Sequence, residues 1–278
     1  TPWRVVNMHM GDTIGGYNFY AEGYPERDGE LEHPRLIEQG EVTSDLFLNE
    51  DVKILEMNSK SGLYPLYVAY SIYRMNLPRE EKDMSLEEAQ TYWCRVLQDH
   101  LFVLCQTKMA VSITKRTLAG YTGVAVNAIY LTKLLERMED QNRLARKLRN
   151  PVTWGLEGSE KMKFNAVVGN PPYQETGGSG GTNDSPLYQY FALSAEELNP
   201  DYISLIMPAR WFSGGRENLL GEFRRHMQQN KSLSLLYVYP EAKEIFPTVE
   251  IKSGLCYYLH DSSYSGKCHY VMIENGKR

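Results

Sequence analysis

From Lys53 onward the sequence alternates short apolar runs with stretches of helical periodicity, and this alternation limits the fold more than any other feature. The apolar runs have the length and composition of buried strands: Val52–Met57, Leu101–Cys105, Val124–Ile129, Ala166–Gly169, Tyr202–Met207, Leu233–Tyr239 and Gly254–His260. A stretch suited to a helix follows each of the first five: Leu63–Arg74, Met109–Leu118, Leu131–Leu148, Pro186–Leu198 and Glu217–Gln229. Repeated strand–helix units predict a parallel sheet with helices on both faces.

The last two predicted strands are joined by Pro240–Lys252, a loop without a helix of useful length. A parallel crossover needs a longer connection, so we expect the seventh strand to run antiparallel to the sixth. The pattern predicts an α/β fold, a mostly parallel seven-stranded sheet with an antiparallel last strand in a reversed edge hairpin. We expect residues 52–278 to form this core, and the polar, turn-rich residues 1–51 to be an N-terminal extension packed on it. Ligands of such sheets bind beyond the carboxyl ends of the strands.

Composition and charge argue against several other classes of protein. No apolar run approaches the roughly 20 residues of a membrane-spanning helix, so no membrane partner is expected. The four cysteines lack CxxC spacing and the histidines lack HExxH or other metal spacing, which predicts a cytoplasmic protein with reduced thiols and no metal. The net charge of -5 is not that of a strongly basic nucleic-acid binder. Because the chain opens on Thr1, we expect it to be a piece of a longer protein.

The tetrapeptide Asn170-Pro171-Pro172-Tyr173 is the most specific local signal, and it follows the predicted strand Ala166–Gly169 directly. Two consecutive prolines fix φ and remove two backbone N–H donors, so the loop offers acceptors without competing donors. The Asn170 side-chain oxygen and an adjacent backbone carbonyl could each accept one hydrogen of an exocyclic NH2 group, while the Tyr173 ring stacks on its heterocycle. This arrangement favours attack by a poorly nucleophilic amine, such as that of adenine, on a methyl sulfonium.

The segment FNAVVGNPPYQ (Phe164–Gln174) resembles the catalytic motif of amino-group DNA methyltransferases, especially the N6-adenine enzymes of bacterial restriction-modification systems. The resemblance extends to TPWRVVNMHM at the N-terminus, and to MPARWFSGGRE and FPTVEIKSGLCYYL after the motif. It implies a Rossmann-like, S-adenosylmethionine-dependent methyltransferase fold. It also implies site-specific, adenine-specific DNA methylation, with four catalytic residues: Asn170, Pro171, Pro172 and Tyr173.

The same resemblance implies a site for S-adenosylmethionine and its product S-adenosylhomocysteine. The segments Lys53–Tyr73 and Leu101–Leu118 match the glycine-rich cofactor loop and the second cofactor strand with its helix. The chain departs from the family at two points: Gly62 is the one glycine of its loop, and Gln106 stands near the position of an acidic ribose ligand. As a neutral group, Gln106 should bind a diol less strongly than a carboxylate does. The implied cofactor contacts are Thr1, Pro2, Glu56, Asn58, Gly62, Gln106 and Asn127.

By this resemblance the substrate is double-stranded DNA whose target adenine is flipped out of the stack, at a cost of a few kcal/mol. The target-recognition domain, and any nuclease, would belong to the rest of a bacterial, cytoplasmic parent protein. We interpret the Gly-rich segment Glu175–Asn183 as a lid over the flipped base. Two alternatives stay open: methylation of the side-chain amide of glutamine in proteins, which uses the same motif, and a catalytically silent methyltransferase-like module for DNA binding or assembly. Adenine N6 is preferred to cytosine N4 by resemblance alone.

Overall fold

The computed structural model describes residues 1–19, 35–37, 42–132, 134, 143–173, 186–212, 217–247, 251 and 253–274. The predicted lid, Glu175–Asn183, lies outside the described residues. The helices are α1 (Trp3–Thr13), α2 (Val42–Phe47), α3 (Leu63–Met75), α4 (Leu86–Asp99), α5 (Lys108–Ala119), α7 (Arg143–Leu148), α8 (Tyr188–Glu197) and α9 (Glu217–Gln229). The strands are β1 (Gly16–Asn18), β2 (Arg35–Ile37), β3 (Ile54–Ser59), β4 (Leu101–Cys105), β5 (Asn127–Tyr130), β6 (Ala166–Gly169), β7 (Tyr202–Pro208), β8 (Leu233–Tyr239), β9 (Leu255–Asp261) and β10 (His269–Met272).

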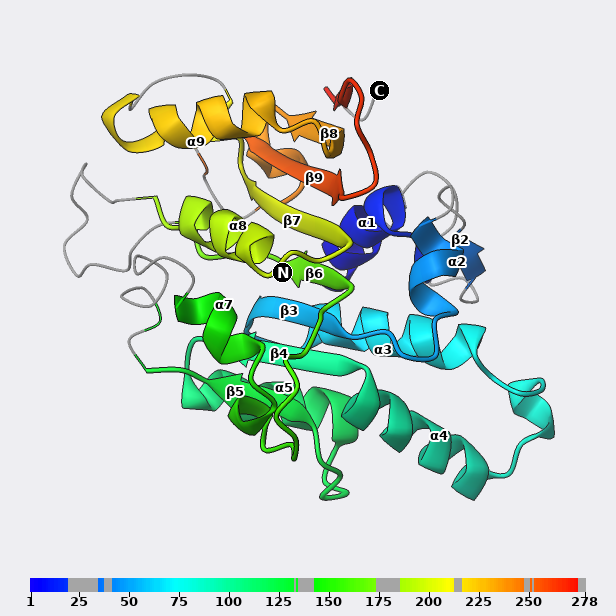
Figure 1. Cartoon of the computed structure of the whole chain (residues 1–278). Coiled ribbons are helices and arrows are strands. Elements are labelled where there is room, and N and C mark those ends of the chain that lie inside the picture. Colours follow the sequence, from blue (N-terminus) through cyan, green and yellow to red (C-terminus); the bar gives the residue numbers. More distant parts are fainter. Residues whose placement is uncertain are drawn as a thin grey trace.

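The central sheet has eight strands in the order β10-β8-β9-β7-β6-β3-β4-β5 (Figure 1). Strand β9 runs antiparallel to its neighbours β7 and β8, and every other adjacent pair is parallel. The predicted α/β fold, its mostly parallel sheet and the antiparallel seventh strand are therefore confirmed. Strands β1 and β2 form a separate antiparallel pair.

Two details of the predicted sheet are wrong. The sheet has an eighth strand, β10, which is the last in the chain and runs parallel to β8. It was missed because His269–Met272 is a short, mostly exposed edge strand without a buried apolar run. The reversed strand β9 also lies between β7 and β8 and not at the edge of the sheet. Its residues Leu255–Leu259 are all buried, which requires neighbours on both sides.

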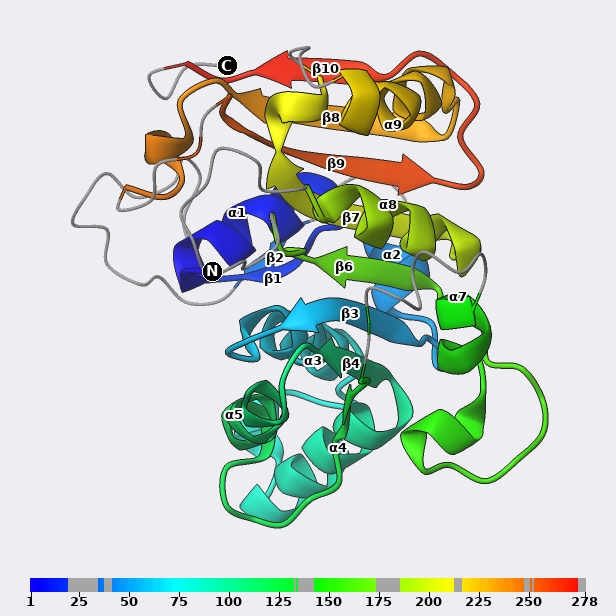
Figure 2. The ribbon, with the colours of Figure 1, turned by 90° about the vertical axis from the view of Figure 1, so that its left-hand side faces the viewer.

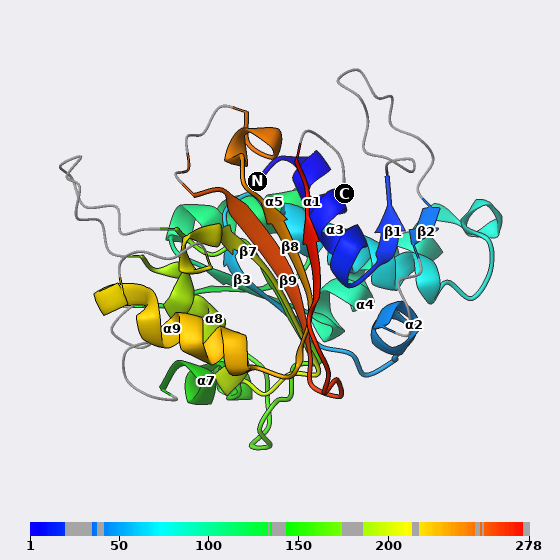
Figure 3. The same ribbon diagram turned by 90° about the horizontal axis from the view of Figure 1, so that it is seen from above.

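Helices cover both faces of the sheet because strand side chains point alternately to the two sides. Ile54, Val103 and Val168 belong to a core shared with α1, α3, α4 and α5, whereas Leu55 and Val167 belong to a second core shared with α7, α8 and α9. Viewed from above, the two helix layers lie on opposite sides of the sheet (Figure 3). The carboxyl edge of the sheet runs between these layers.

The N-terminal helix α1 is built into the first core. Its residues from Val5 to Thr13 are all buried, and Val5, Val6 and Met10 have no exposed surface. The helix contacts α3 and strands β7 and β9. The position of α1 brings the first residues of the chain to the carboxyl edge of the sheet, beside the arrowheads of β3 and β6 (Figure 2).

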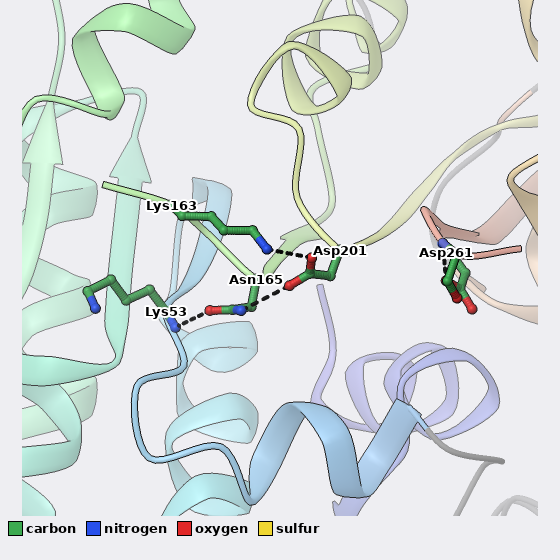
Figure 4. A network of polar contacts seen from close by, with 6 residues as sticks. Lys53, Lys163, Asn165, Asp201 and Asp261 are labelled. Atoms are coloured by element: carbon green, nitrogen blue, oxygen red, sulfur yellow. Dashed lines mark hydrogen bonds and ion pairs between the residues drawn. The ribbon is translucent and has the colours of Figure 1, made fainter. Parts of the chain in front are cut away.

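At the amino edge, one asparagine side chain ties three strands together (Figure 4). Asn165 precedes β6, and its Oδ1 accepts the backbone N–H of Lys53 at 3.0 Å while its Nδ2 donates to Asp201 Oδ2 at 2.9 Å. Asp201 Oδ1 also accepts from Lys163 Nζ at 2.7 Å. Both ends of the amide have partners, so this edge is held by satisfied polar contacts.

Candidate active site

The site forms where β6, β3 and β4 end side by side. Strand β3 pairs in parallel with both β6 and β4, so the ends of these three strands meet at one edge. Gly169 ends β6 with φ 145, and a Cβ atom there would lie 2.7 Å from the Met57 carbonyl oxygen. Glycine is therefore required for β6 to pass this close to β3 just before the Asn-Pro-Pro-Tyr loop.

The amide of Asn170 has one orientation that satisfies both of its ends. Its NH2 group then lies 3.2 Å from the Ile206 carbonyl oxygen, 3.3 Å from that of Pro171 and 3.1 Å from the Tyr173 hydroxyl. Its Oδ1 accepts from the Thr1 hydroxyl at 2.8 Å. In the opposite orientation the oxygen would face acceptors only, so the hydrogen-bond network fixes the amide.

The Ile206 carbonyl can hold Asn170 because β7 is longer than β6. Gly169, the last residue of β6, pairs with Leu205, while β7 continues to Pro208. The carbonyl of Ile206 thus lies beyond the end of the ladder with β6, where the Asn170 side chain provides its donor. A mismatch in strand length therefore anchors the NH2 end of the half-buried Asn170 amide, and its oxygen faces the Thr1 hydroxyl.

Asn58 connects the β3 loop to the Asn-Pro-Pro-Tyr motif. It is skipped in the pairing of β3 with β4 and has φ 85, so this bulge turns its side chain out of the ladder. Its Nδ2 donates to the backbone oxygen of Asn170 at 2.6 Å. Its Oδ1 is buried and has no hydrogen-bond partner within the described part of the chain. Asn58 thus leaves one acceptor unused beside Asn170.

Glu56 supplies a second buried acceptor two residues earlier. The side chain points into the layer of α1 and α3, the residue is 3% exposed, and Oε2 has no partner among the residues described. Burial raises the pKa of Glu56 to about 8, although a hydrogen bond with Ser59 acts to lower it. Glu56 is therefore mainly protonated at neutral pH and would ionise beside a cation.

The turn after β3 is anchored to α5. The Ser59 hydroxyl lies 2.9 Å from Thr114 Oγ1, and the Thr117 hydroxyl donates to the Ser61 carbonyl at 2.7 Å. Gly62 has φ 80, and a Cβ there would lie 3.0 Å from the Thr117 Cβ. Gly62 thus permits both the left-handed turn and its close packing on α5.

Tyr173 is anchored by its hydroxyl. Burial raises the pKa of this phenol, and the hydrogen bond with Asn170 acts in the opposite direction. The residue as a whole is half-buried, so its exposed part lies away from the hydroxyl. Such a residue can offer a fixed aromatic surface to a heterocycle.

The structure brings most of the predicted residues to this edge, but not Asn127. Thr1 contacts Asn170, Pro2 caps α1, and the half-buried Gln106 follows the end of β4. Asn127, an implied cofactor contact near the end of the predicted strand Val124–Ile129, is instead the first residue of β5. Its Nδ2 donates to the carbonyls of Gln98 and Leu101 at 2.7 and 3.1 Å, at the opposite edge.

Sequence analysis missed a buried hydrogen-bond chain behind the site. His9 has Nδ1 2.7 Å from the Tyr64 hydroxyl and Nε2 2.8 Å from Ser204 Oγ, and burial lowers its pKa to about 3. Thr13 Oγ1 donates to the His9 carbonyl, so Ser204 donates to Thr13 and the neutral imidazole donates through Nε2. Tyr64 therefore donates to Nδ1. No local pattern signals these contacts, since the partners of His9 lie 55 and 195 residues away.

Fold and motif together define a Rossmann-like methyltransferase of the restriction-modification type. The chain belongs to the Eco57I restriction-modification methylase family, whose model matches residues 99–246 and includes the Asn-Pro-Pro-Tyr loop. An "Uncharacterized adenine-specific methylase" of Mycoplasma pneumoniae is 38% identical over 108 residues, which are 38% of this chain and 25% of that protein. The chain is thus a homologue of an adenine-specific methylase.

Solved structures show the same fold at low sequence identity. A chain of a type I restriction-modification system has a TM-score of 0.58 and 11% identity, over 99% of this chain and 44% of that one. The ATP-dependent Type ISP restriction-modification enzyme LlaBIII bound to DNA has a TM-score of 0.55 and 15% identity, over 99% and 20%. A modification subunit of a type I restriction enzyme from Vibrio vulnificus has a TM-score of 0.51 and 11% identity, over 100% and 48%. This chain therefore spans less than half of each of these proteins.

The described residues also limit what else the molecule carries. None of their helices has the length and hydropathy needed to cross a membrane. Within the same ranges, no three side chains of histidine, cysteine, aspartate or glutamate gather as a metal site would require.

Proposed function

We propose that the chain is the catalytic core of a site-specific DNA methyltransferase that transfers a methyl group from S-adenosylmethionine to the N6 amino group of adenine. The observation that carries the proposal is the fixed amide of Asn170, whose NH2 group is held by the Ile206 carbonyl. This anchoring leaves the Asn170 oxygen with the Thr1 hydroxyl as its partner among the described residues and with a lone pair that could accept a hydrogen from an entering amine. Membership of a restriction-modification methylase family supports DNA as the substrate.

The end of β3 fits the methionine portion of the cofactor. Glu56 Oε2 and Asn58 Oδ1 are buried acceptors that lack donors within the described ranges, and such atoms cost about 1–3 kcal/mol each when unsatisfied. An α-ammonium group has three N–H donors and would satisfy both. When bound, S-adenosylmethionine supplies an electrophilic methyl sulfonium and leaves as S-adenosylhomocysteine. Gln106 is the proposed ribose contact, Thr1 and Pro2 complete the site, and no metal takes part.

The catalytic loop would orient and polarise the amino group. A carbonyl oxygen has two lone pairs, so the Pro171 carbonyl, which lies 3.3 Å from the Asn170 NH2 group, can still serve as the second acceptor for the two amino hydrogens. Accepting both hydrogens turns the nitrogen lone pair out of conjugation and toward the methyl group. Pro172 removes a competing donor, and Tyr173 stacks on the base. Both acceptors are neutral, so the methylated nitrogen releases its extra proton to water.

The proposed partner is duplex DNA with its target adenine flipped into the loop. We assign recognition of the DNA sequence, and any nuclease, to parts of the parent protein beyond this chain. LlaBIII, a much longer protein, is described as bound to DNA, and this chain covers 20% of it. The proposed enzyme acts in the bacterial cytoplasm, where its DNA substrate is found.

The test measures radiolabel transfer by the purified full-length parent protein. Methyl-labelled S-adenosylmethionine is offered with duplex DNA or with a release-factor-like protein as the acceptor. We expect label in DNA alone, and none with Asn170→Ala at an unchanged circular dichroism spectrum. Label in the protein would favour glutamine methylation. If neither acceptor is labelled and the protein does not bind the cofactor, the result would favour a catalytically silent methyltransferase-like module.

A further inference from the structure

The turn between β3 and α3 carries a charged side chain with no role in the proposed reaction. From Ile54 to Gly62 the only charged residues are Glu56 and Lys60. Glu56 is buried, whereas Lys60 is exposed. Within the described parts of the chain Lys60 forms no ion pair. The site edge thus displays a cation that no carboxylate of the described fold neutralises.

The backbone around Lys60 is held on both sides. Asn58 and Gly62 have φ angles of 85 and 80, which define a tight left-handed turn. On the α5 side, the Thr117 hydroxyl donates to the carbonyl of Ser61, the residue after Lys60. A side chain on a fixed turn loses less freedom on binding than one on a loose loop.

The first turn of α3 adds positive potential beside Lys60. Its N-cap, Gly62, has no side chain to cap the N–H groups of Leu63 and Tyr64, Pro65 has no N–H, and the first turn contains no acidic residue. These N–H groups and the helix dipole favour an anion.

The buried part of the same turn prefers a cation. Within the described residues, Glu56 Oε2 and Asn58 Oδ1 are buried acceptors without donors, and both residues are less than 5% exposed. Two buried acceptors in a turn that also carries an exposed lysine and leads into a helix N-terminus match a zwitterion with an ammonium and a carboxylate.

We propose that Lys60, together with the first turn of α3, binds the α-carboxylate of the methionine portion of S-adenosylmethionine and makes the site selective for the carboxylated cofactor. This inference rests on the proposed function, because it assumes that the cofactor binds here. The nearby Arg4 is already used, since its Nη2 donates to the Ile245 carbonyl at 3.1 Å. Lys108 follows β4, on the proposed ribose side.

The test is calorimetric titration of the full-length protein with two probes, S-adenosylhomocysteine and its decarboxylated analogue S-adenosyl-3-thiopropylamine. We expect wild type to bind the carboxylated probe about tenfold more tightly. Lys60→Met should remove this preference by weakening only S-adenosylhomocysteine. Lys60→Arg should keep the preference, and the matched control Lys108→Met should behave like wild type. Thermal unfolding of each variant checks its fold.

Each contrary outcome has a distinct meaning. A Lys60→Met variant that keeps the wild-type preference for S-adenosylhomocysteine overturns the role of Lys60. A variant whose affinities for the two probes both fall by the same factor overturns it as well. Wild-type protein that binds neither probe instead overturns the proposed cofactor site, and the inference with it.

Discussion

Asn165 and Asn170 flank the same strand, β6, and carry the same side chain to opposite edges of the sheet. At the amino edge, the Asn165 oxygen accepts a backbone N–H and its NH2 group meets a carboxylate. At the carboxyl edge, the NH2 group of Asn170 is anchored while its oxygen meets only the Thr1 hydroxyl. At the amino edge, the Asn165 amide therefore holds strands together. At the carboxyl edge, the strands hold the Asn170 amide in place and leave its oxygen available to a ligand.

The carboxylates of the two edges differ in the same way. Asp201 accepts hydrogen bonds from Asn165 and Lys163. Glu56, in contrast, has a buried oxygen for which the described residues supply no donor. Unsatisfied buried acceptors are costly, so the presence of Glu56 Oε2 and Asn58 Oδ1 near the Asn-Pro-Pro-Tyr motif points to a binding site.

The largest expected effect separates the two asparagines. Asn170→Ala should lower methyl transfer by the full-length protein at least about 100-fold, because it removes the acceptor that orients the amine. Asn165→Ala should retain transfer but lower the unfolding free energy by about 1 kcal/mol, because the half-buried Lys53 N–H and Asp201 carboxylate lose this partner. Transfer assays and denaturant titrations of both variants measure these effects. Equal loss of activity in the two variants would break the comparison.

Tyr173 should contribute through its ring. Tyr173→Ala should lower kcat/KM on duplex DNA about 5- to 150-fold, as expected for the loss of 1–3 kcal/mol of stacking. Tyr173→Phe keeps the ring and should retain most of the activity. Steady-state kinetics on one duplex compare the two. If Tyr173→Phe is as slow as Tyr173→Ala, the contribution of Tyr173 to catalysis comes from its buried hydroxyl and not from stacking by its ring.

Glu56 should make stability depend on pH. Its folded-state pKa is raised from 4.5 to about 8, so between these values the folded state binds more protons than the unfolded state. The unfolding free energy should therefore fall as pH rises from about 5 to 8, by up to about 1.4 kcal/mol per pH unit. Denaturant titrations across this range should show that Glu56→Gln removes the decline. If the unfolding free energy of Glu56→Gln falls with pH as steeply as that of wild type, other titrating groups cause the decline.

The smallest effects concern the two amides assigned to the nucleoside. Gln106→Glu should raise affinity for S-adenosylhomocysteine about 5- to 10-fold, since a carboxylate binds a diol more strongly than an amide. Asn127→Ala should leave that affinity unchanged and lower the unfolding free energy by about 1 kcal/mol, because its partners lie at the amino edge. Calorimetry and denaturant titration distinguish the two roles. Weaker cofactor binding by Asn127→Ala would contradict the placement of Asn127 away from the proposed cofactor site.

The sequence predicts most of the sheet because its strands are buried on both faces. Runs such as Leu101–Cys105 are continuously apolar and flanked by helical stretches, so local pattern and tertiary structure agree. Helix α1 escaped prediction because buried polar residues, including Asn7 and His9, interrupt its apolar pattern. Helix α4 was missed although Ser85 and Glu88 form a capping box before an amphipathic stretch. That signal was present in the sequence.

The site could be predicted only where one segment carries its chemistry. The Asn-Pro-Pro-Tyr loop is such a segment, since its two prolines and its position after β6 are local facts. The anchoring of Asn170 by Ile206 depends on the relative lengths of two strands, which local patterns do not encode. Asn127 was misplaced because the predicted strand Val124–Ile129 begins earlier than β5, which shifts the residue to the wrong edge.

In the proposed function, the carboxyl edge of the sheet transfers a methyl group to adenine through Asn170. The most direct measurement is mass spectrometry of nucleosides from duplex DNA incubated with the full-length protein and S-adenosylmethionine bearing a trideuterated methyl group. The account predicts trideuteromethyl N6-methyladenine with wild type and with Asn165→Ala, and none with Asn170→Ala. Label in cytosine, or label in adenine with Asn170→Ala, would contradict it.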